Sequence, residues 1–283
     1  MSGESKHSLI PTLISVLLKR TQSHAFSVLA GLIDKSPEIT VSLIGNSAPS
    51  ILDYITKDLP MFVQGLGKMK GEFKEEMKKK VCMRVEAMAH IIGRSSKKEL
   101  SPFFKDKARK DKLVEVLGDL IQFQYPSLVQ LIAKTLILAQ YKDPLKTIIA
   151  RMTTHKRTGF LSEAVCKCFL RPEKSTELAV IRFIQEVFDS GFAGFFAMSD
   201  IKMLFQMLVQ KLQELVNFPS DPVVAAFLKT YRSMLGWEAY PAEKPYNSQG
   251  ESVLEDLLNE IEDKASPLAI QASTIMNILR RYE

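Results

Sequence analysis

Helical periodicity along nearly the whole chain constrains the fold more than any other feature. Apolar residues recur at the three- and four-residue spacing of an α-helix, and the period-two alternation that marks strands is hard to find. Short Pro, Gly or Ser runs separate these segments, and most prolines stand near the start of one, where a missing N–H does no harm. The pattern predicts an all-α protein of about a dozen helices joined by short turns.

The Pro, Gly and Ser runs also predict where each helix begins and ends. The predicted helices are 8–19, 22–34, 37–45, 49–63, 71–93, 111–123, 126–140, 144–153, 159–170, 175–189, 199–216, 222–235, 250–263 and 266–281. Two segments interrupt the rhythm, and both are predicted loops: the charged stretch 95–112 and the aromatic stretch 236–250.

Several of these helices are apolar on more than half of their circumference, which is typical of helices covered by neighbours on several sides. The predicted helix 126–140 is an example, with Ile132, Leu136, Ile137 and Leu138. No fixed tetratricopeptide, ankyrin or leucine-rich period is present. We therefore expect a single helical-repeat domain over residues 1–283, an irregular armadillo or HEAT-like α-solenoid, with a globular all-α fold as the alternative.

Two apolar stretches test whether the chain enters a membrane. The stretch 128–139 is interrupted by Lys134 and is shorter than the roughly 20 residues that a bilayer span needs. The run 9–18 is followed directly by Lys19 and Arg20, which favours a first helix over a signal peptide. We expect no membrane span.

Residues that could carry chemistry are few. Three cysteines are too few for a disulfide framework, and Cys166 and Cys168, two apart, point in different directions on a helix, so a reducing cytoplasm fits best. The four histidines lack metal-ligand spacing, and no P-loop, GxSxG, HExxH or dinucleotide fingerprint is present. We expect a protein that is not an enzyme, with no catalytic, metal-binding or cofactor-binding residue and no small-molecule substrate.

Charge is unevenly distributed around the net value of +6. Residues 68–112 hold 15 Lys and Arg against 7 Asp and Glu, whereas residues 238–263 hold eight acids and one base. The densest lysines form a possible basic patch for nucleic acid, anionic lipid or an acidic protein: Lys74, Lys78, Lys79 and Lys80. Interleaved glutamates such as Glu76 and the single aromatic Phe73 favour a solvated helix face over a nucleic-acid site.

The segment 195–215 (FFAMSDIKMLFQMLVQKLQEL) contains the most specific motif. Ser199 is a good N-cap and Asp200 falls in the first turn, so both are predicted to have a structural role at a helix start. The residues 196–204 resemble a signature of the WISH/DIP family, whose usual form is an aromatic pair followed by Thr, Asn, Asp, Leu, Lys, Val and Leu. This chain differs from that form at Ala197, Met198 and Ser199.

The neighbouring segments extend this resemblance. Residues 177–189 before the motif, and residues 221–235 and 254–261 after it, follow the order of helices in the leucine-rich domain of the WISH/DIP family. The boundary between the two central helices lies at Phe218 and Pro219. The best resemblance therefore covers residues 175–262.

The resemblance implies a function through binding. Members of the WISH/DIP family fold as armadillo-type arrays, bind the Arp2/3 complex and activate it without a preformed actin filament, which nucleates linear, unbranched filaments. We expect the same of this chain, as a cytoplasmic monomer at cortical actin or endocytic patches, with actin itself as a further candidate partner. The chain has no SH3 domain or PxxP segment, so it resembles the minimal fungal members.

The contact residues and two competing functions stay open. Four cations of the 199–235 hairpin are candidates for contact with an acidic helix, although exposed cations also serve solubility alone: Lys202, Lys211, Lys229 and Arg232. One competing function is an armadillo or HEAT-type scaffold for another protein partner. The other is binding of nucleic acid or anionic lipid through residues 68–112, for which affinity would fall steeply with salt.

Overall fold

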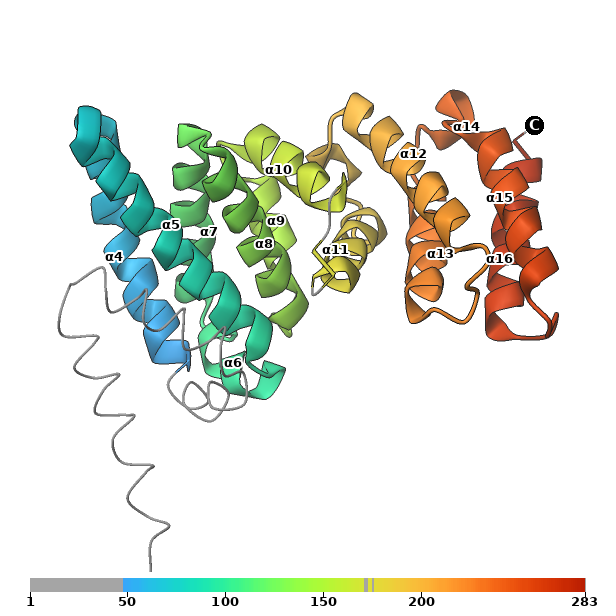
Figure 1. The fold of residues 1–283 in the computed structure, drawn as a ribbon, viewed down its shortest axis with the longest axis horizontal. Coiled ribbons are helices and arrows are strands. Elements are labelled where there is room, and N and C mark those ends of the chain that lie inside the picture. The colour runs from blue at the N-terminus through green and yellow to red at the C-terminus, as the bar shows by residue number, and fades with distance from the viewer. Residues whose placement is uncertain (1–47, 171–172, 175, 283) are drawn as a thin grey trace, which may run out of the picture. The chain divides into compact units, whose positions relative to one another are not determined.

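The computed structural model describes residues 48–170, 173–174 and 176–282, and within them the fold is all-α and solenoid-like, without a strand (Figure 1). The predicted helices 8–19, 22–34 and 37–45 lie outside the described residues. The chain divides into two compact units, residues 1–164 (unit 1) and 165–283 (unit 2), and α10 (Thr158–Leu170) crosses the division. Whether the whole chain forms one domain stays a prediction.

Unit 1 stacks helices that are neighbours or near neighbours in sequence. Its described elements are α4 (Ala48–Lys68), α5 (Gly71–Arg94), α6 (Lys97–Phe104), α7 (Lys107–Leu120), the 3₁₀ turn η2 (Ile121–Phe123), α8 (Pro126–Lys142) and α9 (Ile148–Thr153). Helix α5 packs between α4 and α8, α4 also contacts α6 and α7, and α7 contacts α9. Aliphatic side chains dominate the buried interface of α5 and α8, such as Val85, Ile92, Ile132 and Leu136.

Unit 2 repeats this packing with a more aromatic core. Its described elements are α11 (Glu177–Asp189), η3 (Ala193–Phe195), α12 (Met198–Leu215), α13 (Pro222–Leu235), α14 (Tyr240–Glu243), α15 (Asn247–Glu260) and α16 (Pro267–Arg280). Helix α13 contacts α11, α12 and α16, and α15 contacts α12 and α16. The ring of Phe205 lies 6.1 Å from that of Tyr231 and 5.1 Å from that of Tyr240, all three fully buried.

Helix boundaries agree with the sequence prediction along most of the chain, but the two predicted loops are largely helical. The stretch 95–112 contains α6 and the start of α7, and 236–250 contains α14 and the start of α15. A capping box starts α6, because Ser96 Oγ accepts from the N–H of Glu99 and the Glu99 carboxylate accepts from the N–H of Ser96. Asp106 caps α7 by accepting from the N–H groups of Ala108 and Arg109.

The predicted N-cap at Ser199 is wrong. Helix α12 starts at Met198 after an extended Ala197, so Ser199 lies inside the first turn, where Asp200 also lies, as predicted. Phe195 and Phe196 are buried, and the ring of Phe196 lies 6.2 Å from that of Phe188 on α11. This aromatic contact fixes the chain just before the helix, and the helix therefore begins without a side-chain cap.

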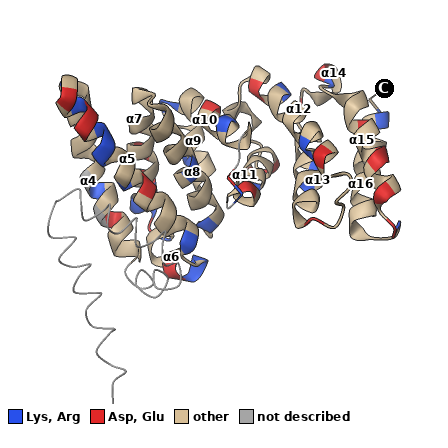
Figure 2. Cartoon of the chain, in the orientation of Figure 1, with Lys and Arg blue, Asp and Glu red and all other residues tan. Residues whose placement is uncertain are grey.

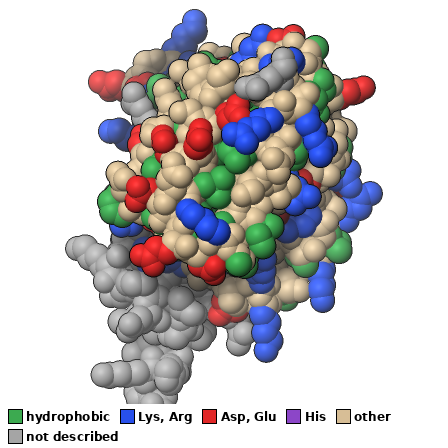
Figure 3. Space-filling view, turned by 90° about the vertical axis from the view of Figure 1, so that its right-hand side faces the viewer, with side chains coloured by type: hydrophobic (Ala, Val, Ile, Leu, Met, Phe, Trp, Pro, Cys, Tyr) green, Lys and Arg blue, Asp and Glu red, His purple; other side chains and the backbone are tan. Residues whose placement is uncertain are grey.

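Charged residues gather on particular helices of each unit. Lys and Arg alternate with Asp and Glu along the first turns of α5 in unit 1, and α15 in unit 2 is rich in acids (Figure 2). The end of unit 2 that carries α15 and α16 mixes small hydrophobic patches with charges of both signs (Figure 3). Among the described residues, no helix is long and apolar enough to cross a bilayer.

Candidate functional site

A groove with a volume of about 800 Å³ opens in unit 2 between α11, α13 and α16. Its apolar lining includes Phe188 of α11 and Pro267 and Ile270 of α16. Ile270 is 58% exposed, which is unusual for a large aliphatic side chain next to a core. The groove is therefore an open surface with an apolar component.

The cations of the groove come from α13, whose orientation follows from its sequence. Asp221 caps the helix by accepting from the N–H of Val223, with Pro222 in the first turn. Apolar residues at helical spacing, such as Phe227 and Tyr231, turn inward, which leaves Lys229 and Arg232 on the opposite side.

The buried hydroxyl of Thr230 joins α13 to α11. Thr230 Oγ1 lies 3.0 Å from the carbonyl oxygen of Ala226 on its own helix and 3.3 Å from that of Ile181 on α11. Thr230 is fully buried, and in sequence it lies between the groove residues Lys229 and Arg232. Its contact with Ile181 therefore holds the α13 wall of the groove against the α11 wall.

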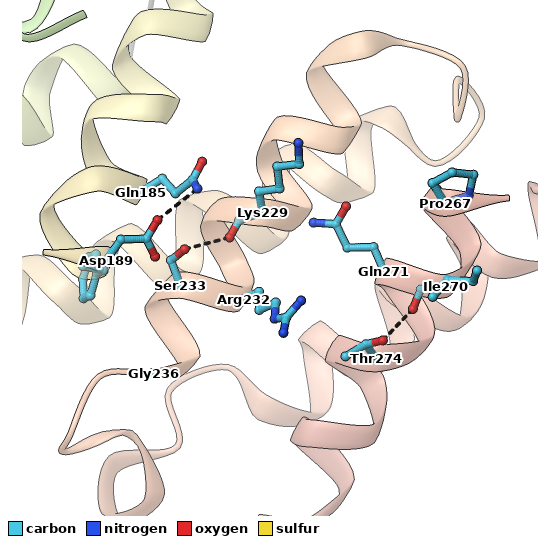
Figure 4. A pocket seen from close by; sticks show the side chains of 11 residues that line it. Gln185, Asp189, Lys229, Arg232, Ser233, Gly236, Pro267, Ile270, Gln271 and Thr274 are labelled. Atoms are coloured by element: carbon cyan, nitrogen blue, oxygen red, sulfur yellow. Dashed lines mark hydrogen bonds between the residues drawn. The ribbon is translucent and has the colours of Figure 1, made fainter. Parts of the chain in front are cut away.

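Three polar side chains point into the opening (Figure 4). Lys229 and Arg232 extend from α13, and Gln271 extends toward them from α16. On α11, Gln185 Nε2 donates to the Asp189 carboxylate over 3.0 Å, so the one acidic group of the groove is held on the far wall. Neither Lys229 nor Arg232 forms an ion pair with any described residue.

The charge of the groove lining is suited to binding. Its lining carries two cations against one carboxylate, so its net charge is positive. The groups whose pKa shifts most are Tyr231 and Tyr240, whose pKa values burial raises far above the ordinary value, and neither lines the groove. Among the described residues, no group of His, Cys, Asp and Glu is placed to hold a metal ion. The lining is complementary to a ligand that is anionic and partly apolar.

Only two of the four predicted hairpin cations belong to this groove. Lys202 of α12 pairs with Glu243 of α14 at 2.7 Å, and Lys211 pairs with Glu214 on its own helix at 2.6 Å. Lys229 and Arg232 lie together at the groove. Two of the four cations are therefore engaged in local ion pairs, and the other two face the groove.

Within the predicted basic patch, Lys78 and Lys80 have local partners. Lys78 lies 3.4 Å from Glu75, and Lys80 lies 2.6 Å from Glu76. Lys74 and Lys79 have no ion pair among the described residues, so the patch is only partly neutralised.

The sequence prediction missed the third wall of the groove. Pro267, Ile270 and Gln271 of α16 lie beyond residues 175–262, where the family resemblance was strongest. The sequence did carry a weak signal, because Ile270 stands off the apolar stripe that Ala269, Ala272 and Ile275 form on the same helix.

Comparison with known proteins adds no assignment: neither a protein-family model nor a curated protein matches the chain. The class of protein is therefore defined by the fold and the groove, as an all-α, solenoid-like protein with an open, positively charged groove in unit 2.

Proposed function

We propose that this chain acts by binding another protein in the groove between α11, α13 and α16, and that the partner is the Arp2/3 complex. One observation carries the binding function: Lys229 and Arg232 face an opening with an apolar lining and lack a carboxylate partner among the described residues. Unlike most surface lysines, these cations are presented beside apolar area that a partner can cover.

The choice of partner rests on the resemblance of residues 175–262 to the WISH/DIP family. Two of the three groove walls, α11 and α13, lie within that stretch. The chain would then act at cortical actin or endocytic patches in the cytoplasm and nucleate linear filaments without a preformed filament.

Activation requires the groove to prefer one state of its partner. A bound protein shifts a conformational equilibrium only by its difference in affinity for the two states. The groove would bind an acidic segment of the Arp2/3 complex more tightly in the active arrangement, so that binding raises the population of nucleating complexes. No covalent chemistry is needed.

Pyrene-actin assembly with purified Arp2/3 complex and no preformed filaments tests this proposal. The wild-type chain should shorten the lag at micromolar concentration. The charge reversal Lys229→Glu with Arg232→Glu should weaken binding about a hundredfold, because it puts two acids opposite an acidic segment. The reversal of two exposed cations of unit 1, Lys105→Glu with Lys107→Glu, makes the same change in net charge and should keep the wild-type lag.

Two results would count against the proposal. An unchanged lag with the wild-type chain would reject the Arp2/3 complex as the partner, and recovery of a different stoichiometric partner would make the chain a scaffold for that protein. Equal activity of the groove variant and its control would reject the groove as the binding surface.

A further inference from the structure

The α4–α5 hairpin of unit 1 ends in a segment that the described residues of the unit leave largely uncovered. None of the first ten residues of α5, 71–80, is buried, whereas eight residues are buried from Val81 onward. At 1.5 Å per residue, these ten residues span about 15 Å. They are not wholly free, because Lys78 Nζ lies 4.3 Å from the centre of the Tyr125 ring. The last residues of α4, 61–68, bury only Leu66. We call residues 61–80 the hairpin tip; the two helices meet there at the upper left of Figure 1.

Three large apolar side chains are exposed within this short segment. Met61 is 63% exposed, Met69 36% and Phe73 74%, the last being the highest value among the exposed large hydrophobic residues. The methyl groups of Met69 and Met77 both lie within 4 Å of the position that a Cβ on Gly65 would take, so flexible methionines close over the turn. Such a group of apolar side chains at one end of a unit marks an interaction surface.

The charges around these side chains are mostly positive. Lys68, Lys70 and Lys74 have no ion pair among the residues that the structure describes. Of the three acids in the tip, Glu75 lies beside Lys78 and Glu76 beside Lys80. A hydrogen bond and the charge of Lys80 hold the pKa of Glu76 below its usual range, so this carboxylate stays ionised and paired.

Helix geometry separates the remaining acids from the apolar side. At 100° per residue, Phe73, Met77 and Lys74 fall on one side of α5, and Glu72 and Glu75 fall on the opposite side. Glu76, which pairs with Lys80, falls about 60° from Phe73, so this side of the tip is apolar and mostly basic.

We propose that the hairpin tip docks on an anionic phospholipid surface. The end of a two-helix hairpin is convex, so it fits a soft surface into which Met61, Met69 and Phe73 can insert, while a partner helix needs a groove. Lysines beside inserted apolar side chains lie at the level of the lipid headgroups and attract acidic lipids. Nucleic acid fits less well, because Phe73 is the only exposed aromatic side chain of the tip and base stacking uses several. Phe62 is half-buried, with the Arg84 guanidinium 4.2 Å from the centre of its ring.

The proposal goes beyond the groove and is independent of it. The tip belongs to unit 1, and all residues that line the groove belong to unit 2. If both hold, one chain carries a surface for an anionic membrane and another for a protein partner.

Flotation of the full chain with phospholipid vesicles tests the tip. Vesicles of phosphatidylcholine with about a third phosphatidylserine should carry the chain upward, vesicles of phosphatidylcholine alone should carry much less, and salt should weaken the binding. Phe73→Ser should lower the partition coefficient about tenfold, through lost apolar burial. Lys70→Glu with Lys74→Glu should lower it more than about 25-fold, since each lysine near such a surface contributes about fivefold.

Two matched variants are the controls. Phe218, between α12 and α13, is 63% exposed and lies outside the tip, so Phe218→Ser should bind vesicles like the wild type. Lys105→Glu with Lys107→Glu repeats the charge change elsewhere in unit 1 and should lower the partition coefficient less than the tip reversal. Circular dichroism of all variants should show unchanged helix content.

Three outcomes overturn the proposal. They are equal binding to the neutral and anionic vesicles, no binding to either, and equal losses in the tip variants and their controls. If the wild-type chain binds no vesicle and a photocrosslinker placed at Phe73 captures a protein, the tip is a protein-binding surface instead. The actin assay separates this result from the groove, because Phe73→Ser should leave the lag unchanged.

Discussion

The two units bury polar groups in different ways. In unit 1, Lys110 and Asp143 are 3% and 0% exposed, and the amine lies 3.4 Å from the carboxylate. Unit 2 buries two tyrosines completely. The hydroxyl of Tyr240 donates to Asn247, and that of Tyr231 has no partner among the described residues. One unit buries opposite charges, and the other buries neutral groups.

A hydrogen-bond network surrounds the buried ion pair of unit 1. Asp143 accepts from the N–H groups of Leu145 and Thr147 and from the Thr147 hydroxyl, which in turn accepts from Lys110 at 2.7 Å. This network ties α7 to the connection between α8 and α9, and every member depends on the carboxylate. Breaking a buried ion pair lowers the free energy of unfolding more than losing a neutral hydrogen bond, because the charge that remains is neither paired nor hydrated.

The largest expected effect is therefore in unit 1. Asp143→Ala should lower the free energy of unfolding by about 3–5 kcal/mol, because Lys110 is left buried without a counter-charge. Urea denaturation measures this loss, and Asp256→Ala, on an exposed position of α15, should change stability by less than about 0.5 kcal/mol. The double change Lys110→Met with Asp143→Leu should recover part of the loss, because it removes the unpaired charge but not the three donors of Leu145 and Thr147 that Asp143 accepts from. Equal losses in the double and single variants would contradict the ionic explanation.

The next effect tests how tightly unit 2 packs around its phenols. A Cβ on Gly250 of α15 would lie 1.9 Å from the Tyr231 hydroxyl oxygen. Gly250→Ala should therefore destabilise the protein by about 1–3 kcal/mol, although alanine is the better helix former.

The matched control for this glycine is Gly159 in α10. A Cβ there would have no neighbour within 4 Å, so Gly159→Ala should be neutral or slightly stabilising. Adding Tyr231→Phe to Gly250→Ala should recover part of the lost stability, because it removes the nearest atom. Thermal unfolding monitored by circular dichroism compares all of these variants, and no recovery in the double variant would place the clash elsewhere.

The third prediction sets the two tyrosines against each other. Tyr240→Phe removes the 3.0 Å hydrogen bond to Asn247 and should cost about 1 kcal/mol. Tyr231→Phe removes a hydroxyl without a described partner and should be neutral or stabilising by up to about 1 kcal/mol. The urea midpoint of each variant, compared with that of the wild type, measures these effects. A loss of stability in Tyr231→Phe as large as that in Tyr240→Phe would indicate that a bound water partners the Tyr231 hydroxyl.

The smallest effect is a dependence on pH that unit 1 alone should contribute. Burial lowers the pKa of His155, although Asp119 opposes that shift, and the ring lies against Gly118 of α7. Because the folded state binds this proton more weakly than the unfolded state, the contribution is full above pH 6.5, the ordinary histidine value, and declines below it.

The measurement is the free energy of unfolding between about pH 5 and 8. His155→Gln should flatten the decline below pH 6.5, whereas Tyr231→Phe in unit 2 should leave it unchanged, since phenols do not ionise in this range. An unchanged decline in the His155 variant would assign the dependence to another group.

The sequence predicted the helices well where local signals decide. The predicted segments 71–93 and 222–235 match α5 and α13 closely, because apolar spacing and Pro222 or Gly71 mark their ends. The predicted loop 95–112 is wrong because it overlooks two local helix starts, the capping box of Ser96 and Glu99 and the N-cap Asp106. Yet Lys110 is buried and its partner Asp143 lies 33 residues later, a contact that no local pattern contains.

The groove was predictable to a similar extent. The periodicity of α13 placed Lys229 and Arg232 on the side away from the core, and the structure puts both at the groove. The α16 wall depends on tertiary packing of helices some 40 residues apart in sequence, which periodicity does not report. Local spacing thus indicated which side chains face outward, and only packing showed which of them share an opening.

The length of the hairpin tip also determines how strongly the other charges of unit 1 act on the tip lysines. The first ten residues of α5 span about 15 Å, while the Debye length at physiological ionic strength is about 8 Å. The tip lysines are therefore screened from most charges in the body of unit 1, and an approaching surface meets their local field and not the average of the whole chain. The net charge of +6 is consequently a poor guide to what this end of the protein attracts.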